Sequence, residues 1–528
     1  MGRSISTNLD SLDQPVSVFA GEAIAQGNLV KITQGGYVHK VLEAQSLAAQ
    51  NNSAPAPVTS ANMTTNYGDA TSGGASFQNI LAMANGGFAH AFPGNGSAAS
   101  TGMNLGFYSP LAALGMVTVL GSAATSGSAK LAFAGADNIA VAWQEASNIM
   151  LAIVNHTTGA IVAAAANVGN ATTSAISWDL IRLASGEVVV AYPNATDMVF
   201  KRYSASGALQ GAMTVVEAAV TPSWVVLLPL AAGGFIVRYA RTAATAGLRM
   251  ARFNAAGVMQ GAVVQITSGA NLYEGPLQSA VVGAMRGKII ELSNGNIVTN
   301  HPSVPTVAAF KLYDSSLNLL ATVNMAAGLN SGYGELPQFA PKAGGGFWAT
   351  PMSPTVVNEY TNTGVLVRSS GNSTAPFGTA RIIDRPGNGP LVMSHNNTPG
   401  SASSWTLNSL KPDLSALEAT GTLVYNNGSN GYQSHWTEML TTGYSISITQ
   451  GTSQTFGTLN LMANTAMSVL GVATQAAAAG AAVKVATAGK FTMTQNLTSP
   501  AFDRRAATPP GTKGATFGNS AVLSGING

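Results

Sequence analysis

The sequence contains no cysteine and few charged residues. Cysteine is absent from all 528 residues, which excludes disulfides, thiolate metal sites and cysteine nucleophiles. Asp, Glu, Lys and Arg together make up only 9% of the chain, and the formal net charge is +3. Because no Lys/Arg cluster forms a basic stripe, the sequence predicts no nucleic-acid partner.

Long apolar runs are also missing. The first residues, MGRSISTNLDSLDQP, contain no apolar segment that could act as a secretion signal. The longest apolar run, VVLLPLAAGGFIV, is too short and too interrupted by glycine to span a bilayer. We therefore expect synthesis in a cytoplasm and no insertion into a membrane.

Glycine and other small residues are what the chain has in quantity. There are 59 glycines, and Ala, Ser, Thr and Asn fill much of the remainder. This balance is typical of β-rich proteins whose surfaces are solvated by uncharged polar groups. The 46% of hydrophobic residues is ample for a large buried core.

A small-residue turn followed by an apolar run recurs along the middle of the chain. The spacing is roughly 50 residues, within the range expected for propeller blades. Its copies are NHTTGAIV at Asn155, SASGALQG at Ser204, NAAGVMQG at Asn254, DSSLNLLA at Asp314 and TNTGVLVR at Thr361. An earlier run aligns in a second register with eight copies: GGFAHAF ending at Phe92, NIAVAW at Trp143, EVVVAY at Tyr192, GFIVRY at Tyr239, NIVTNH at His301, GFWATP at Pro351, PLVMSH at His395 and GYSISI at Ile448.

Each unit reads as four short β-runs, for example WDLIRLA, EVVVAY, MVFKRYS and AMTVVE. Gly or Asn before the aligned run indicates tight hairpins, and the runs alternate too quickly for helices. The sequence therefore predicts an all-β fold, a β-propeller of eight four-stranded blades, or of seven if the first or last unit is incomplete. A β-solenoid or a row of sandwiches is the alternative, although solenoid coils are usually shorter and sandwich domains longer.

The two ends of the chain have similar patterns. Residues 14–42 and 468–496 each contain an apolar run, a small-residue turn and a short strand ending in a Gly hairpin, and neither is long enough to fold alone. We infer a discontinuous β-module, a small barrel or sandwich, from residues 1–44 and 466–528. The propeller, residues 75–465, is then an insertion between its halves. A Ser/Asn/Ala/Pro-rich linker is expected over residues 45–74.

Three phrases from these ends are VFAGEAIAQGNLVKI, LGVATQAAAAGAAVKVATAGKFTM and FDRRAATPPGTKGATFGNSAVLSGI. They resemble the β-modules of tailed-bacteriophage virion proteins, of both capsid-decoration and tail-fibre types. The resemblance covers about a fifth of the chain and does not extend to the blades. It implies that the terminal module anchors the protein to a virion, while the inserted propeller projects outward.

A search for catalytic patterns finds none that stands out, so no catalytic, cofactor-binding or metal-binding residue is predicted. Sialidase-like Ser-x-Asp-x-Gly-x-Thr-Trp turns and Gly-x-Ser-x-Gly elbows are absent. His301 and His395 share a register and could hold a metal, but lack acidic neighbours in the sequence. Glycosidases need two carboxylates about 5 to 10 Å apart, and the acidic residues are scattered: Glu187, Glu217, Glu274, Glu291, Glu335 and Glu359.

The second register suggests a candidate ligand-binding rim. It places aromatic and imidazole side chains at the end of the same strand in six blades, on one face of the ring: Phe92, Trp143, Tyr192, Tyr239, His301 and His395. Such a collar could stack on sugar rings, whereas the alternative is that these side chains pack as core between blades. Arg238, next to Tyr239, either lines the channel or pairs with a neighbouring carboxylate.

These observations predict a non-enzymatic virion structural protein of a tailed phage. We expect partners among other capsid or tail proteins, a host-surface glycan or receptor, and a homo-oligomer, with a trimer suggested by the tail-fibre resemblance. The alternative from another class is a glycan-active enzyme, such as a capsule depolymerase, with its site on the propeller face. A bacterial surface adhesin would need an export signal, which we do not find.

Overall fold

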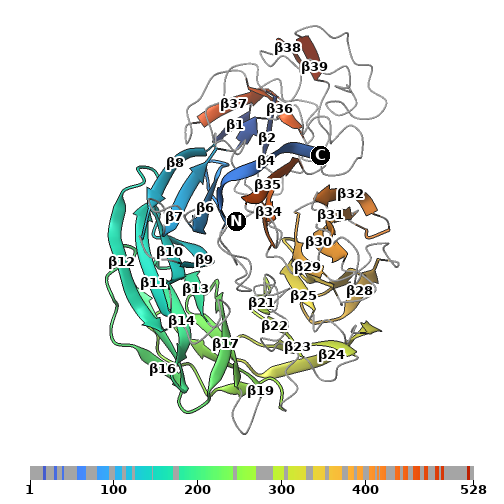
Figure 1. Ribbon diagram of the computed structural model, residues 1–528. Coiled ribbons are helices and arrows are strands. Elements are labelled where there is room, and N and C mark those ends of the chain that lie inside the picture. The colour runs from blue at the N-terminus through green and yellow to red at the C-terminus, as the bar shows by residue number, and fades with distance from the viewer. Residues whose placement is uncertain are drawn as a thin grey trace.

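Figure 1 shows the computed structural model of the chain, whose described residues contain strands and no helix. The structure describes residues 16–19, 29–32, 38–40, 56–66, 80–93, 102–109, 114–121, 125–145, 147–170, 178–241, 247–268, 289–301, 307–328, 337–350, 356–370, 379–385, 389–396, 404–410, 413–415, 417–423, 435–439, 444–449, 456–463, 469–473, 482–486, 489–492 and 520–523.

The described strands include eight four-stranded antiparallel sheets, which follow one another around an axis as the blades of a propeller (Figure 1). This confirms the predicted all-β propeller and its larger blade count. The first four blades are blade 1, β5 (Ile80–Ala82), β6 (Phe88–Pro93), β7 (Met103–Tyr108) and β8 (Leu114–Val119); blade 2, β9 (Thr125–Ala134), β10 (Asn138–Glu145), β11 (Asn148–Asn155) and β12 (Ile161–Asn170); blade 3, β13 (Asp179–Arg182), β14 (Val188–Asn194), β15 (Asp197–Tyr203) and β16 (Thr214–Glu217); and blade 4, β17 (Pro222–Pro229), β18 (Phe235–Arg241), β19 (Gly247–Phe253) and β20 (Val264–Gln265).

The ring continues with four more blades of the same plan. They are blade 5, β21 (Ile289–Glu291), β22 (Ile297–Asn300), β23 (Val307–Tyr313) and β24 (Leu319–Gly328); blade 6, β25 (Gln338–Pro341), β26 (Phe347–Thr350), β27 (Asn358–Tyr360) and β28 (Leu366–Ser369); blade 7, β29 (Thr379–Ile383), β30 (Leu391–Asn396), β31 (Ser404–Leu410) and β32 (Leu417–Leu423); and blade 8, β33 (His435–Met439), β34 (Tyr444–Thr449), β35 (Phe456–Ala463) and β4 (Ala56–Asn66). The first strands lie innermost, and β33 of the last blade contacts β5 of the first.

Strand β4 corrects the predicted linker over residues 45–74. Residues 56–66 form the outermost strand of blade 8 and pair antiparallel with β35, with Ser60 opposite Asn460 and Ala56 opposite Ala463. The Ser/Asn/Ala/Pro-rich composition that suggested a linker does not prevent these residues from pairing as a strand. Pairing the early β4 with strands near the other end of the chain closes the ring non-covalently.

The two chain ends meet in a separate five-stranded sheet beside the ring (Figure 1). Its strand order is β1-β37-β36-β2-β3, so the two late strands, β37 and β36, lie between the early strands β1 and β2. The strands are β1 (Val16–Phe19), β2 (Leu29–Ile32), β3 (Val38–Lys40), β36 (Val469–Ala473) and β37 (Ala482–Ala486), and a further pair is formed by β38 (Gly489–Thr492) and β39 (Ser520–Leu523). Every blade strand therefore lies between the two halves of this sheet in the sequence.

The core of the ring lies between neighbouring blades. Alternation along each strand sends one set of side chains to the preceding blade and the other set to the following blade. Between blades 3 and 4, Phe200 packs edge-on against Phe235 and Phe253, with ring centroids 5.0 and 4.9 Å away. Between blades 5 and 6, Phe310 packs in the same way against Phe347 and Tyr360. These repeated contacts hold the blades face to face.

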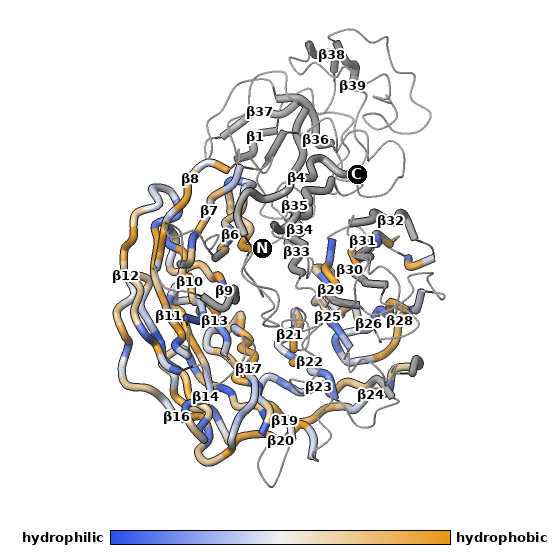
Figure 2. Tube along the Cα trace, in the orientation of Figure 1, coloured by the Kyte–Doolittle hydropathy of each residue, from blue (hydrophilic) through white to orange (hydrophobic). Residues whose placement is uncertain are grey.

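The outer circumference of the ring carries many exposed hydrophobic side chains. The exposed large hydrophobic side chains lie on or just before the outermost strands of the first six blades, for example Val119 on β8, Ile161 on β12 and Leu319 on β24. Hydrophobic stretches reach the circumference along β12 and β24 in Figure 2. Each outermost strand is also a sheet edge, where backbone groups have no partner within the blade.

We call the edge of the ring that carries the turns between first and second strands, and between third and fourth strands, the turn face. The recurring small-residue motif forms the turns between third and fourth strands. In four of its five copies, the side-chain oxygen of the first residue accepts a hydrogen bond from the backbone N–H four residues later, whereas Asn155 accepts one from Thr158, three residues later. The distances are 3.1 Å for Ser204, 2.9 Å for Asn254, 2.9 Å for Asp314 and 3.1 Å for Thr361. The fourth residue has positive φ, which favours glycine: Gly207 (84°), Gly257 (78°) and Gly364 (79°), with Leu317 (67°) the exception.

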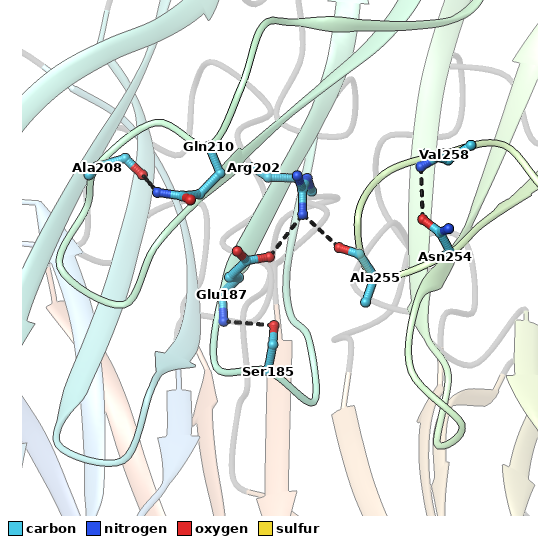
Figure 3. A network of polar contacts seen from close by, with 8 residues as sticks. All are labelled: Ser185, Glu187, Arg202, Ala208, Gln210, Asn254, Ala255 and Val258. Atoms are coloured by element: carbon cyan, nitrogen blue, oxygen red, sulfur yellow. Dashed lines mark hydrogen bonds and ion pairs between the residues drawn. The ribbon is translucent and has the colours of Figure 1, made fainter.

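These turns also join the blades at the turn face. In Figure 3, Arg202 of blade 3 bonds to Glu187 of its own blade and to the carbonyl of Ala255 in the turn of blade 4, at 3.0 and 2.6 Å. The same contact, from a polar side chain to the carbonyl of the second turn residue in the next blade, recurs from Asn138 to Ala205, from Arg252 to Ser315 and from Asn296 to Asn362.

Candidate functional site on the loop face

We call the opposite edge of the ring, where second strands end and third strands begin, the loop face. The predicted aromatic register lies at this edge, but its aromatic side chains are not displayed. Phe92, Trp143, Tyr192 and Tyr239 are at most 2% exposed. The last three belong to the apolar clusters between blades, each facing the preceding blade. Because all four side chains are buried, the collar interpretation is wrong for them, and Trp143, Tyr192 and Tyr239 form the inter-blade core that we weighed against it.

The polar ends of these buried aromatic side chains have partners. Tyr192 donates from its hydroxyl to the carbonyl of Val168 in blade 2, at 3.0 Å. Tyr239 donates to a carboxylate oxygen of Glu217 in blade 3, and Trp143 donates to Glu145 at 3.3 Å. Burial raises the pKa of Tyr192 to about 12, so its hydroxyl remains protonated at neutral pH. These side chains have the contacts of structural residues.

The two histidines of the register differ in what can be said of them. His301 follows β22 directly and is half-buried. By strand alternation it lies on the side of Ile297, which packs against blade 4. His395 lies in β30 opposite Trp405, but its side chain is outside the described residues. The predicted shared histidine site can therefore be assessed only at His301. Among the described residues there is no group of three or more His, Cys, Asp or Glu side chains that could hold a metal.

Arg238 is buried between blades 4 and 5. Its guanidinium carbon lies 4.9 Å from the ring centroid of Trp224, and its Nη2 donates to Asn300 Oδ1 of blade 5. Arg238 has a further contact besides these, and its predicted pairing with a carboxylate stays a prediction. A cation over an indole face is a favourable and desolvated arrangement, and it links the innermost strand of blade 4 to the second strand of blade 5.

Buried polar atoms without a hydrogen-bond partner concentrate at the loop face. Across the part of the chain that the structure describes, they lie at the strand ends of blades 3 to 6 on this side of the ring. They include Trp178 Nε1, Trp224 Nε1, Arg241 Nε, Arg249 Nε, Thr299 Oγ1, His301 Nδ1, Gln338 Oε1 and Thr350 Oγ1. Because leaving such an atom unpaired in the interior costs about 1–3 kcal/mol, their concentration needs an explanation.

Three of these residues, Trp224, Thr299 and His301, lie at the interface between blades 4 and 5. Thr299 is opposite Lys311 in the β22–β23 register, and His301 follows two residues later on the same side. Lys311 donates from Nζ to the carbonyl of Ile266 in blade 4, at 2.5 Å. Trp224 and Arg238 stand on the blade 4 side, and Asn300 connects Arg238 to this segment. We call this group the blade 4–5 site; its members are Trp224, Arg238, Thr299, Asn300, His301 and Lys311.

Burial and charge shape the titration of the blade 4–5 site. Burial, with a smaller contribution from the charge of Lys311, lowers the pKa of His301 to about 4. Burial also lowers the pKa of Lys311 from its usual value. His301 is therefore neutral at pH 7, with one ring nitrogen donating and the other accepting. The site offers hydrogen-bond donors and acceptors together with positive charge.

The sequence reasoning missed Lys311, Thr299 and Trp224. A usable signal was the F-K-x-Y pattern shared by the third strands of blades 3 and 5, Phe200 to Tyr203 and Phe310 to Tyr313. It places Lys201 and Lys311 at equivalent positions opposite Val190 and Thr299. Only the tertiary structure shows which carbonyl each lysine reaches.

No protein-family model matches the sequence, and no curated protein matches it. Among solved structures, the chain is similar to the Dos1 propeller (10% identity, TM-score 0.40, 84% of each chain covered). It is also similar to dihydro-heme d1 dehydrogenase NirN in complex with DHE (10% identity, TM-score 0.42, 68% of this chain and 71% of that chain). A third is the WD40 domain of Toxoplasma gondii coronin (12% identity, TM-score 0.37, 63% of this chain and 80% of that chain). At these TM-scores, the likenesses carry no argument about what this chain binds or catalyses.

Proposed function

We propose that the protein is a non-enzymatic structural protein of a tailed-bacteriophage particle. In this proposal the sheet formed by both chain ends anchors the protein to the virion, and the propeller is displayed for adhesion to the host surface or as a head or tail appendage. The phrases that resemble phage β-modules support the first part. The observation that carries the proposal is the strand order β1-β37-β36-β2-β3, with every blade inserted between its early and late strands.

The topology is compatible with display of the propeller on a particle, because the terminal sheet and the ring are separate structures. A sheet that contains both ends fixes the propeller at a single place, since both connections to the ring start from it. The ring itself is closed by pairing β4 with β35, so it keeps its shape independently of what the terminal sheet contacts. Many copies on one particle would convert weak individual contacts into strong attachment, and we expect a homo-oligomer at each site.

The enzyme alternative requires two carboxylates that converge on one site. Four described carboxylates at or near blade interfaces instead contact cations: Asp179 with Lys130, Glu187 with Arg202, Glu217 with Arg249, and Glu359 with Lys342 and Arg368. Carboxylates held in this way have structural partners, which favours the binding function over glycan hydrolysis.

The test is to locate the protein in purified particles. Phage particles from a lysate of cells that carry the gene would be analysed by mass spectrometry and by cryo-electron microscopy. We expect the chain in the particles, with the terminal sheet against other virion proteins and the ring facing solvent. Absence of the chain from purified particles would overturn the proposal. A ring buried within the particle would replace adhesion by a cementing role, and capsule-degrading activity of the purified protein would favour the enzyme.

A further inference from the structure

We propose that the blade 4–5 site binds an acidic saccharide, with a sugar carboxylate beside Lys311 and sugar hydroxyls beside Thr299 and His301. This inference rests on the proposed adhesion function, for which it names the class of receptor. Its ligand is a glycan that carries uronic-acid residues, recognised from the loop face of the propeller.

Blade 3 has the same architecture as blade 5 but different side chains at the equivalent positions. There, Val190, Tyr192 and Lys201 occupy the positions of Thr299, His301 and Lys311. Tyr192 and Lys201 both donate to the carbonyl of Val168, at 3.0 and 2.6 Å, and Val190 is apolar. The blade 3 version leaves none of these three side chains with an unpaired polar atom, so the architecture does not require one.

Blade 5 replaces that closed arrangement with an open one. Lys311 repeats the contact of Lys201 by donating to the carbonyl of Ile266. Thr299 introduces a hydroxyl where blade 3 has an isopropyl group, and His301 introduces a ring nitrogen, and both Thr299 Oγ1 and His301 Nδ1 are buried without a partner. Trp224 Nε1 on the blade 4 side is in the same condition. Incoming hydroxyl or carboxylate oxygens would supply partners to such atoms.

Charge selects an acidic ligand. The ammonium of Lys311 is partly buried and its described contact is a neutral carbonyl, so two of its three donors remain for another group. A carboxylate that meets such donors away from bulk water forms stronger, charge-assisted hydrogen bonds.

Access is provided by the two outermost members of the site. His301 and Lys311 are partly exposed, whereas Thr299 and Trp224 are fully buried behind them. A saccharide therefore meets the lysine and the imidazole first. The mixture of donors and acceptors matches a polyhydroxylated ligand and does not match an apolar one, which would leave the same atoms unpaired.

The experiment is a calorimetric titration of the full-length protein with a trigalacturonate, and with maltotriose as the neutral saccharide. Physiological ionic strength screens non-specific attraction between the ligand and the chain. We expect binding of the trigalacturonate and not of maltotriose. Lys311→Gln should weaken binding by about tenfold or more, which corresponds to about 1.4 kcal/mol. Thr299→Val, which keeps the side-chain shape, should also weaken it.

The matched control is Lys201→Gln, which removes the equivalent lysine of blade 3. We expect this variant to bind the trigalacturonate as the wild type does, and thermal unfolding would verify that each variant is folded. The proposal is overturned if the wild type binds no trigalacturonate, if maltotriose binds equally well, or if the two lysine variants lose the same affinity. If the particles contain the chain but the protein does not bind trigalacturonate, the virion function is supported and the saccharide site is wrong. If the protein binds trigalacturonate specifically but is absent from particles, the saccharide site is supported and the virion function is wrong.

Discussion

The interface between blades 2 and 3 and the interface between blades 4 and 5 have the same strand arrangement but different polar contacts. In the first, Lys130 pairs with Asp179 while Tyr192 and Lys201 converge on one carbonyl. In the second, the equivalents of the last two residues, His301 and Lys311, leave donors and acceptors unused. The repeat architecture therefore accepts both paired and unpaired polar side chains at these equivalent positions, because stability is shared among the blades. Trp178 Nε1 at the first interface is unpaired as well.

The largest effect is expected from breaking the closed interface. Asp179 accepts from Lys130 Nζ at 3.0 Å and from the backbone N–H of Leu227 in blade 4 at 2.8 Å, so it joins three blades. Asp179→Ala leaves the buried ammonium without its carboxylate and should lower the free energy of unfolding by about 3–5 kcal/mol. Urea unfolding measures this. The control is Glu187→Ala, which removes a partly exposed ion pair with Arg202 and should lower the free energy of unfolding by less than about 1 kcal/mol. Equal losses for the two variants would show that the buried pair of Asp179 and Lys130 contributes no more than an exposed one.

Acid should weaken the open interface more than the closed one. The pKa of His301 is about 4 in the fold and about 6.5 in the unfolded chain, so the unfolded state binds the proton first. Stability therefore falls as pH decreases from about 6.5 to about 4, and this contribution levels off below the folded pKa. We expect a loss of about 1–2 kcal/mol in the free energy of unfolding, less than the full pKa shift would give, because the imidazole is partly exposed.

The matched variant for this prediction is His301→Tyr, which installs the residue of blade 3. Thermal unfolding of both proteins between pH 7 and pH 4 isolates the contribution of His301. His90, buried in blade 1 with a pKa lowered to about 3 by burial, titrates equally in both proteins. Parallel pH profiles for the wild type and the variant would show that His301 has no such role.

Removing one hydroxyl from each interface should have opposite effects. In the closed interface, Tyr192→Phe deletes the hydrogen bond to Val168 while Lys201 keeps its own bond to the same carbonyl. We expect a loss of about 1 kcal/mol in the free energy of unfolding, the usual value of one buried hydrogen bond. A variant as stable as the wild type would mean that the hydroxyl contributes nothing there.

In the open interface, Thr299→Val removes a hydroxyl that has no partner. The replacement has the same shape and should raise the free energy of unfolding by about 0.5–1 kcal/mol, because a buried polar group is no longer left unpaired. Denaturant midpoints of the two variants can be compared directly with the wild type. Destabilisation by Thr299→Val would show that an ordered water already satisfies the hydroxyl in the unliganded protein.

Much of the fold could be predicted because it depends on local patterns. The small-residue motif encodes a turn whose first side chain caps the backbone four residues later, as at Ser204 and Thr361. Strand periodicity and the regular spacing of these turns then give the blade count. The strand β4 could not be predicted in this way, because residues 56–66 lack that turn and have a composition typical of linkers.

Two residues of the predicted rim, Arg238 and His301, belong to the blade 4–5 site, whereas its aromatic residues do not. The register correctly places Tyr192, Tyr239 and His301 at equivalent strand ends, but a register does not state which side chains face another blade. Burial turned the aromatic members into core. Lys311 and Trp224 come from strands of two different blades, and no local sequence pattern indicates that they share an interface.

The repeat, most blade strands, the turns and the pairing potential of the two ends are encoded locally, because they follow from side-chain period and turn chemistry over a few residues. The tertiary structure decided which strand closes the ring, which side chains become core, and which polar atoms remain without partners. These outcomes depend on contacts between residues far apart in the chain, as between Arg238 and Asn300, and such contacts exist only once the blades are packed.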